Sequence, residues 1–171
     1  RTPNLDRLAR ESANFRNAYV QAPVCVPSRV SFFTGRYPHS HRNRVNYTPC
    51  DEREVFVQRL FQEGGYQTGS VGKLHYYPPT VEQARRTGFD MVELDDGVPG
   101  TDRYSDYVKW RNRNDPTAGR VPYTAFAKGK NPFRAAIDYE YTPVAWTGLK
   151  TREMLRRMAG GGRPFFLFSS F

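Results

Sequence analysis

The stretch VCVPSRVSFFTGR places a cysteine two residues before a proline and four residues before an arginine. Pro27 near the first turn and Gly35 after the last turn predict a helix with Cys25 around its N-cap. A helix N-terminus favours a thiolate and a bound oxyanion, and Arg29 emerges on the helix face of Cys25. Cys25 is therefore a candidate nucleophile beside an anion site. Three alternatives stay open for Cys25: an inert buried cysteine, a metal ligand, or half of a disulfide with Cys50.

The stretch GYQTGSVGKLH, residues 65–75, predicts a strand that runs into a loop with a lysine and a histidine. It is not a phosphate-binding P-loop, because a required glycine falls at Gln67 and Leu74 follows the lysine. Lys73 and His75 flank Leu74, so in an extended segment their side chains point to one side. Such a pair can bind an anion and transfer a proton. The alternative is a solvated lysine beside a structural histidine.

Two further groups have the residue types of metal ligands. His39 and His41 lie two residues apart, but no carboxylate or cysteine stands near them at ligand spacing, so metal binding is the weaker interpretation. Glu93, Asp95 and Asp96 form the acidic cluster of ELDDG, which is more typical of a turn than of a metal site. Neither group predicts a metal centre by itself.

Helix signals alternate with signals for buried strands along the chain. Helical spacing and end signals occur in TPNLDRLARES, EVFVQRLFQEGG and WTGLKTREMLRRMAGGG. Buried strands are predicted for YQTGSVGK and PFFLFSSF. A short strand or an extended segment is predicted for ANFRNAYVQAP. This alternation predicts an α/β fold with a largely parallel sheet flanked by helices. Residues 76–145 predict a loop-rich excursion with one short helix near YSDYVKWRNRN. Within it, Tyr76, Tyr77 and Trp110 could line a substrate pocket or simply pack.

Taken together, these stretches resemble the sulfatase family. The segment TPNLDRLARESANFRNAYVQAPVCVPSRVSFFTGRYP is similar to the first family signature, with its C-x-P-S-R core, and GYQTGSVGKLH is similar to the second. The resemblance covers residues 2–75, weakens through the middle, and returns at RPFFLFSSF. It implies an alkaline phosphatase-like sandwich, of which residues 1–171 form part of a single catalytic domain. Both ends fall inside predicted elements, so we expect a piece of a longer polypeptide.

The resemblance also implies roles for four residues. Cys25 would be converted to formylglycine by a formylglycine-generating enzyme and would join the shell of a metal ion, usually calcium. One hydroxyl of the hydrated aldehyde attacks sulfur, and the other then expels sulfate. Arg29 would hold the formylglycine hydroxyl near the metal, Lys73 would contact the sulfate group, and His75 would hydrogen-bond the second hydroxyl. The family's other metal ligands lie outside this chain, so we expect the chain alone to bind calcium poorly and to hydrolyse no sulfate ester.

The predicted function of the full protein is hydrolysis of a sulfate ester of a small molecule or carbohydrate. The first alternative is a phosphonate monoester or phosphodiester hydrolase of the same superfamily, and the second is a non-catalytic basic module that binds sulfated polysaccharide or nucleic acid. The net charge is +9, but the arginines are scattered without a dense basic run, so a nucleic-acid partner is not expected. No apolar run reaches the roughly 18 residues of a membrane span. Compartment and oligomeric state stay open.

Overall fold

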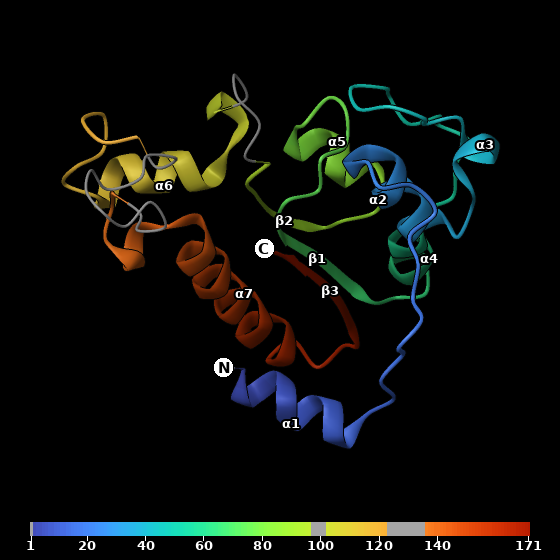
Figure 1. Ribbon diagram of the computed structural model, residues 1–171, viewed down its shortest axis with the longest axis horizontal. Coiled ribbons are helices and arrows are strands. Elements are labelled where there is room, and N and C mark those ends of the chain that lie inside the picture. Colours follow the sequence, from blue (N-terminus) through green and yellow to red (C-terminus); the bar gives the residue numbers. More distant parts are fainter. Residues whose placement is uncertain (1, 97–101, 123–135) are drawn as a thin grey trace.

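A parallel three-stranded sheet forms the centre of the protein. The computed structural model describes residues 2–96, 102–122 and 136–171 of the chain. Its strands are β1 (Gln67–Gly72), β2 (Met91–Leu94) and β3 (Phe165–Ser170), in the order β2-β1-β3. Their last residues stand side by side in the register, so all three strands end at the same edge of the sheet (Figure 1). The α/β fold with a parallel sheet is thus confirmed.

Helices cover both faces of this sheet. Alternate side chains of a strand point to opposite faces, and on β3 Phe166 and Phe168 join one core cluster while Leu167 joins another. Figure 1 shows α7 on one side of the sheet and α2, α4 and α5 on the other. The helices are α1 (Pro3–Glu11), α2 (Cys25–Thr34), α3 (Pro38–His41), α4 (Val57–Glu63), α5 (Val81–Arg86), α6 (Asp106–Asn114) and α7 (Pro143–Ala159).

The larger core cluster anchors the helix that carries Cys25. Val26, Val30 and Phe33 of α2 are almost fully buried, and the Phe33 ring packs edge-on against Phe168 of β3 at 4.8 Å between centroids. Each such fully buried apolar side chain contributes about 1.5–3 kcal/mol. Because the apolar face of α2 is held on the sheet, the rotation of the helix about its own axis is set. The direction of the Cys25 side chain is set with it.

Two glycines of β1 allow close packing on either side of the strand. A Cβ on Gly69 would meet the side chains of Met154 and Met158 in α7. A Cβ on Gly72 would overlap the carbonyl group of Ser170, and the φ of Gly72 is 88°. Gly72 therefore lets the end of β3 approach the end of β1, at the edge where the candidate site lies.

One stretch differs from the sequence-based prediction, and a second takes one of its two predicted forms. Residues 76–145 contain α5, β2 and α6, so the expectation of a single short helix there was wrong. The strand β2 has four residues and α5 has six, which is too short for a clear hydrophobic period. ANFRNAYVQAP forms no strand and is an exposed, extended segment, the second of the two predicted forms (Figure 1). Residues 97–101 and 123–135 of the excursion lie outside the described part of the chain.

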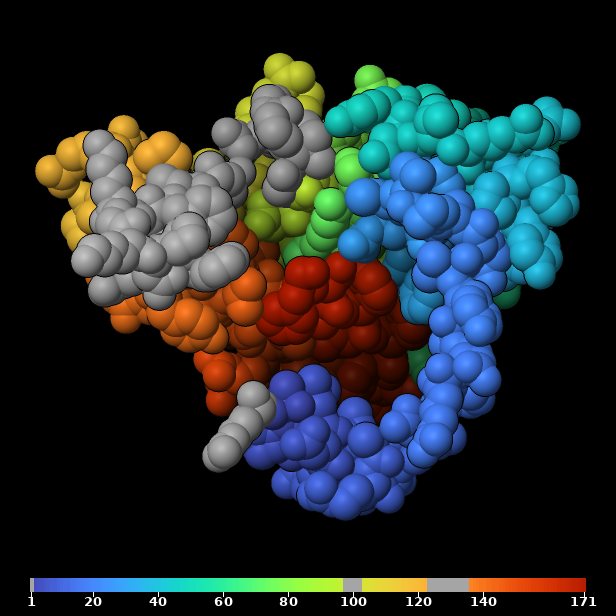
Figure 2. Space-filling view, in the orientation of Figure 1, coloured from blue at the N-terminus to red at the C-terminus, as the bar shows by residue number. Residues whose placement is uncertain are grey.

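The N-terminal helix stands apart from the core. None of its residues is buried, and the side chains of Leu5 and Leu8 are exposed. Figure 2 shows residues of β3 in a hollow between α7 and the extended segment that joins α1 to α2. In the described part of the chain, every helix is too short or too polar to cross a bilayer.

Candidate active site

Cys25 is the first residue of α2 and is exposed. The N-cap position is Val24, so the helix starts two residues earlier than the predicted start at Pro27. The amide of Val26 donates to Asn46 Oδ1 at 3.0 Å, which ties a loop of the following segment to the helix mouth. Gly35 ends the helix in the left-handed conformation, as expected. An exposed cysteine at this point contradicts the alternative of an inert buried residue.

The second cysteine lies in a different environment. Cys25 and Cys50 are both free, so the disulfide alternative is not found. Cys50 is buried, and its burial raises the pKa of its thiol to about 11. The Cys50 thiol therefore stays protonated and unreactive at neutral pH, which leaves Cys25 as the candidate for chemistry.

Arg29 joins α2 to the ends of two strands. Its Nη1 donates to the carbonyl oxygen of Lys73 at 2.6 Å, and both Nη atoms lie 3.2 Å from Ser170 Oγ. Burial lowers the pKa of Arg29, while the nearby Asp96 and Cys25 act in the opposite direction. The guanidinium is thus a fixed, partly desolvated cation, and such a cation attracts an anion more strongly than one in open solvent.

Lys73 and His75 follow β1 but do not continue it. The amide of Lys73 donates to the carbonyl of Ser170 at 3.2 Å, and the next two amides, of Leu74 and His75, both donate to Asp96 Oδ1. His75 has a φ of 54°, in the left-handed region. The predicted extended geometry of this segment was therefore wrong. The reason is a carboxylate from the end of β2 that draws two consecutive amides to one oxygen.

The ring of His75 is buried without a hydrogen-bond partner. The side chain is 7% exposed, and neither Nδ1 nor Nε2 is bonded to a described residue. Burial, followed by the charges of Lys73 and Arg29, lowers the pKa of His75 to about 4. The ring is therefore neutral at pH 7, with one nitrogen able to donate and the other able to accept. Buried polar atoms are normally satisfied, so both ring nitrogens are available to a partner that the described residues do not supply.

A hollow of about 440 Å³ lies in front of Cys25. It is lined by Cys25 and Arg29 of α2, by Phe32, and by Phe168 and Ser170 of β3, together with the segment before the helix. The predicted placement of Cys25 and Arg29 on one helix face is thus confirmed. The side chains of Lys73 and His75 do not line this hollow. Lys73 is connected to it through its carbonyl, which accepts from Arg29. The charge of Lys73 also lowers the pKa of His75.

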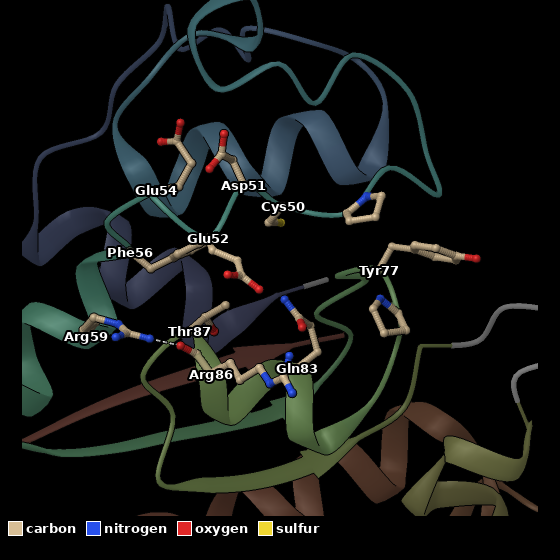
Figure 3. Close-up of a pocket in the computed structure, with 12 residues that line it drawn as sticks. Cys50, Asp51, Glu52, Glu54, Phe56, Arg59, Tyr77, Gln83, Arg86 and Thr87 are labelled. Atoms are coloured by element: carbon tan, nitrogen blue, oxygen red, sulfur yellow. Dashed lines mark hydrogen bonds between the residues drawn. The ribbon is translucent and has the colours of Figure 1, made fainter.

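A second cavity of about 480 Å³ lies between α5 and the loop that precedes α4 (Figure 3). Cys50, Tyr77 and three acidic side chains line it, and Arg59 donates to the carbonyl of Arg86 at its wall. None of the four predicted site residues lines it. The thiol in this cavity is that of Cys50, which stays protonated at neutral pH. We therefore place the candidate chemistry at Cys25 and not in this cavity.

The predicted aromatic lining is divided between core and surface. Tyr76 is buried against Phe33 and Phe56, and Trp110 packs near Tyr141. Tyr77 is 39% exposed, and Tyr47 lies 6.1 Å from it and 6.4 Å from His75 between ring centroids.

The charges of the site suit an anion and not a metal ion. Within residues 2–96, 102–122 and 136–171, no three side chains of His, Cys, Asp or Glu converge on a point. Calcium prefers six to eight oxygen ligands, so these residues do not fit it as a complete site. The cation beside Cys25 is Arg29, whose guanidinium suits the oxygens of a tetrahedral anion. The turn that carries Lys73 and His75 is joined to Arg29 through the Lys73 carbonyl.

The two histidines of YPHSH have structural roles. His41 is buried, its Nδ1 accepts from the amide of Asn43, and its Nε2 lies 2.9 Å from Ser31 Oγ. The ring of His39 stacks on Tyr37. The weaker interpretation of this pair as metal ligands therefore finds no support in their contacts.

Three residues support the site in ways that the sequence did not indicate. Asn46 holds the mouth of α2, Ser170 receives the guanidinium of Arg29, and Asp96 holds the turn at His75. Asp96 was visible only as a member of an acidic turn. Nothing local distinguishes these residues, because each acts on a segment more than 19 positions away in the chain.

Comparison with known proteins gives the family. The Sulfatase family profile matches residues 1–171. An arylsulfatase of Clostridium perfringens is 30% identical over 99% of this chain and 37% of its own length. An ulvan-active sulfatase of Formosa agariphila is 38% identical over 81% of this chain and 30% of its own length. The chain thus spans about a third of the length of these curated relatives.

The fold has a solved counterpart. The phosphonate monoester hydrolase of Agrobacterium radiobacter superposes on all of this chain and on 36% of its own chain, with a TM-score of 0.72 and 23% identity. At this identity the likeness concerns the fold alone. It agrees with the helix-flanked parallel sheet described above. Because the family profile covers the full length and an arylsulfatase aligns along nearly all of it, this chain belongs to the sulfatase family.

Proposed function

We propose that the protein carrying this chain hydrolyses sulfate esters, with Cys25 as the precursor of a formylglycine nucleophile. The observation that supports the proposal is the meeting of α2 with the ends of β1 and β3 at Arg29. Cys25 stands exposed at the start of α2, and Arg29, on the same face, bonds to the ends of β1 and β3. A nucleophile is therefore held beside a fixed cation, as the transfer of a sulfuryl group requires.

Each residue of the site has a role in this reaction. Arg29 holds the group at position 25 and neutralises developing negative charge, since its guanidinium is fixed before substrate binds. Lys73 contacts the sulfate oxygens. His75 is neutral at pH 7, so it can hydrogen-bond a hydroxyl at position 25 and take its proton when that hydroxyl expels sulfate. The buried, unpartnered ring nitrogens of His75 support this role.

Two groups that family membership implies enter this proposal only through Cys25. Formylglycine, made from Cys25 by a formylglycine-generating enzyme, supplies the attacking hydroxyl as its hydrate. Calcium is the usual ion of the family, and position 25 is the ligand that we assign to it in this chain. The described residues form no complete site for the ion, so we route no step of the reaction through it.

Two exposed tyrosines next to His75 are the aromatic groups that we assign to the rest of the substrate. Tyr47 and Tyr77 are 61% and 39% exposed, their rings contact each other, and the Tyr47 ring also contacts His75. Aromatic faces pack well against sugar rings and against aromatic leaving groups. We therefore propose a sulfated carbohydrate or small molecule as the substrate.

Mass spectrometry of the peptide containing Cys25 tests the proposal most directly. In protein from its native host, we expect the thiol of Cys25 to be replaced by an aldehyde and the thiol of Cys50 to remain. Cys50 serves as the internal control, because both residues experience the same handling. An intact thiol at both positions would refute formylglycine catalysis.

A phosphonate monoester or phosphodiester hydrolase is the second candidate. Both ester types carry one negative charge on a tetrahedral centre, so the cations Arg29 and Lys73 suit them as they suit a sulfate ester. Parallel assays of the full protein with an aryl sulfate and an aryl phosphonate monoester separate the two. A higher kcat/KM for the phosphonate would replace the sulfatase proposal with this one.

A further inference from the structure

Asp96 links the end of β2 to the turn that carries Lys73 and His75. It lies two residues after β2 and is 3% exposed. Its Oδ1 accepts two hydrogen bonds, from the amide of Leu74 at 3.1 Å and from the amide of His75 at 2.8 Å. Consecutive amides of an extended strand point in opposite directions, so one oxygen can accept both only where the backbone turns.

The turn is one that the backbone does not adopt without support. His75 has a φ of 54°, in a region that only a few per cent of non-glycine residues occupy, with asparagine, aspartate and histidine the most frequent among them. Such a conformation persists when the surrounding structure holds it in place. Asp96 provides that support from a different strand. The same turn holds the carbonyl of Lys73, which is the acceptor of Arg29 Nη1 at 2.6 Å.

We propose that Asp96 is a positioning residue of the active site, whose carboxylate fixes the turn that presents Lys73 and His75 to the anion. This inference rests on the proposed function and adds to it a residue that does not touch the substrate. Oδ1 acts on main-chain amides, so its effect is geometric and passes through His75 and Lys73. A residue whose role was to bind substrate would not need to accept hydrogen bonds from two consecutive backbone amides.

The role predicts a distinct order of activities among substitutions at this position. Asp96→Asn keeps an acceptor oxygen at the same distance from the backbone, so we expect kcat for an aryl sulfate within about 10-fold of wild type. Asp96→Ala removes the acceptor, and the misplaced turn should lower kcat by about 100-fold. Asp96→Glu keeps the charge but moves the oxygen by the length of one methylene group, so its kcat should be close to that of the alanine variant.

Asp95 offers a matched control. It is the adjacent residue, is also buried, and its Oδ1 accepts from the Ser105 hydroxyl instead of from the turn. Asp95→Ala therefore removes a buried carboxylate of the same kind while the turn is left intact. Its kcat should stay close to wild type at a temperature where both alanine variants are folded. If Asp96→Ala does not fold, the comparison of Asp96→Asn with Asp96→Glu decides between geometry and charge.

Amide hydrogen exchange in the full protein supplies a readout that needs no catalysis. The amides of Leu74 and His75 should be protected in wild type and in Asp96→Asn, and should lose that protection in Asp96→Glu and Asp96→Ala. An inactive wild type with this exchange pattern would refute the proposed function and leave Asp96 as the anchor of the turn. A glutamate variant with full activity beside an inactive asparagine variant would overturn the inference, because charge and not geometry would then be required.

Discussion

At the scale of single residues, the site depends on the shape of the Arg29 side chain as well as on its charge. Its donors reach the carbonyl of Lys73 and the hydroxyl of Ser170 at the same time. A planar guanidinium can do this, because it presents several donors in a fixed fork, whereas an ammonium group is a compact point charge. The position of the cation is therefore set by two strand ends.

We expect Arg29→Lys to lower kcat/KM for an aryl sulfate by about 100-fold, because the charge stays but the forked donors that fix its position are lost. Its melting temperature should change little. Arg36→Lys is the matched control, since Arg36 pairs with Glu54 outside the site. The comparison uses initial rates of wild type, Arg29→Lys and Arg36→Lys, measured over the same range of substrate concentrations. Equal values of kcat/KM for Arg29→Lys and wild type would contradict the role.

The lowered pKa of His75 makes a prediction for stability against pH. Its folded pKa is about 4 against an ordinary value of 6.5, because of burial and then of Lys73 and Arg29. Between these values the unfolded chain binds more protons than the folded one, so the contribution of His75 to stability is complete above pH 6.5 and is lost as the pH falls towards 4. The backbone of His75 also faces the carboxylate of Asp96.

Melting temperatures of wild type and His75→Gln from pH 7 to pH 4.5 test this. The melting temperature of wild type should fall relative to the variant as the solution is acidified, since the variant has no ring to protonate. Two curves that stay parallel over this range would show that His75 is not buried as a neutral ring.

Residue types and spacing found half of the site. The four-residue spacing of Cys25 and Arg29 was enough to place them on one face, because a helix brings such positions together by its own geometry. The same kind of reasoning failed for Lys73 and His75, where strand geometry was assumed. The turn there is imposed by Asp96, which lies 21 positions beyond His75.

At the scale of elements, the meeting of β1 and β3 determines the site. Gly72 ends β1 with a φ of 88°, and the carbonyl of Ser170 occupies the space that a Cβ would need. The amide of Lys73 then donates to that same carbonyl. The close approach of the two strands thus places Ser170 Oγ within reach of Arg29.

Gly72→Ala should lower the free energy of unfolding by about 3 kcal/mol, because left-handed backbone strain and overlap with a backbone carbonyl add together. Gly35→Ala is the control, since Gly35 has a φ of 68° and a Cβ added there would meet nothing within 4 Å. Gly35→Ala introduces the backbone strain without the overlap, so it should lower the free energy of unfolding by about 1 kcal/mol. Urea unfolding of both variants measures the difference, and equal losses would show that β3 moves freely away from β1.

The elements found from the sequence are those with strong local signals. The helical spacing and glycine stop of α7 and the buried run of β1 were recognised, since each signal is complete within its own segment. The strand β2 was missed because four residues carry little pattern, and its place in the sheet comes from pairing with Gly69–Gly72 of β1. Yet β2 delivers Asp96 to the site.

At the scale of the whole molecule, the chain brings cations, and not metal ligands, to the proposed site. Arg29 lies near Cys25, and Lys73 and Arg29 lie near His75, whereas the described residues contain no cluster of metal ligands. The chain covers about a third of its curated relatives. Under the proposed function, this segment supplies positive charge for the sulfate group.

Residues 1–171 expressed alone should bind calcium with a Kd of about 1 mM or weaker, because few oxygen ligands are offered. They should also hydrolyse no aryl sulfate, even with formylglycine at position 25. Calorimetric titration with calcium and a long-incubation assay check both expectations. The full protein treated in the same way is the control, and measurable turnover by the isolated chain would contradict the prediction.

The sequence by itself determined the α/β class, the helix that presents Cys25 and Arg29, and the family, because periodicity, caps and signature motifs are local properties of the chain. Only the tertiary structure decided how the site is held. Arg29 meets Lys73 across 44 positions and Ser170 across 141, and Asp96 turns the backbone of a neighbouring strand. These contacts depend on strand order and register, which no local pattern specifies.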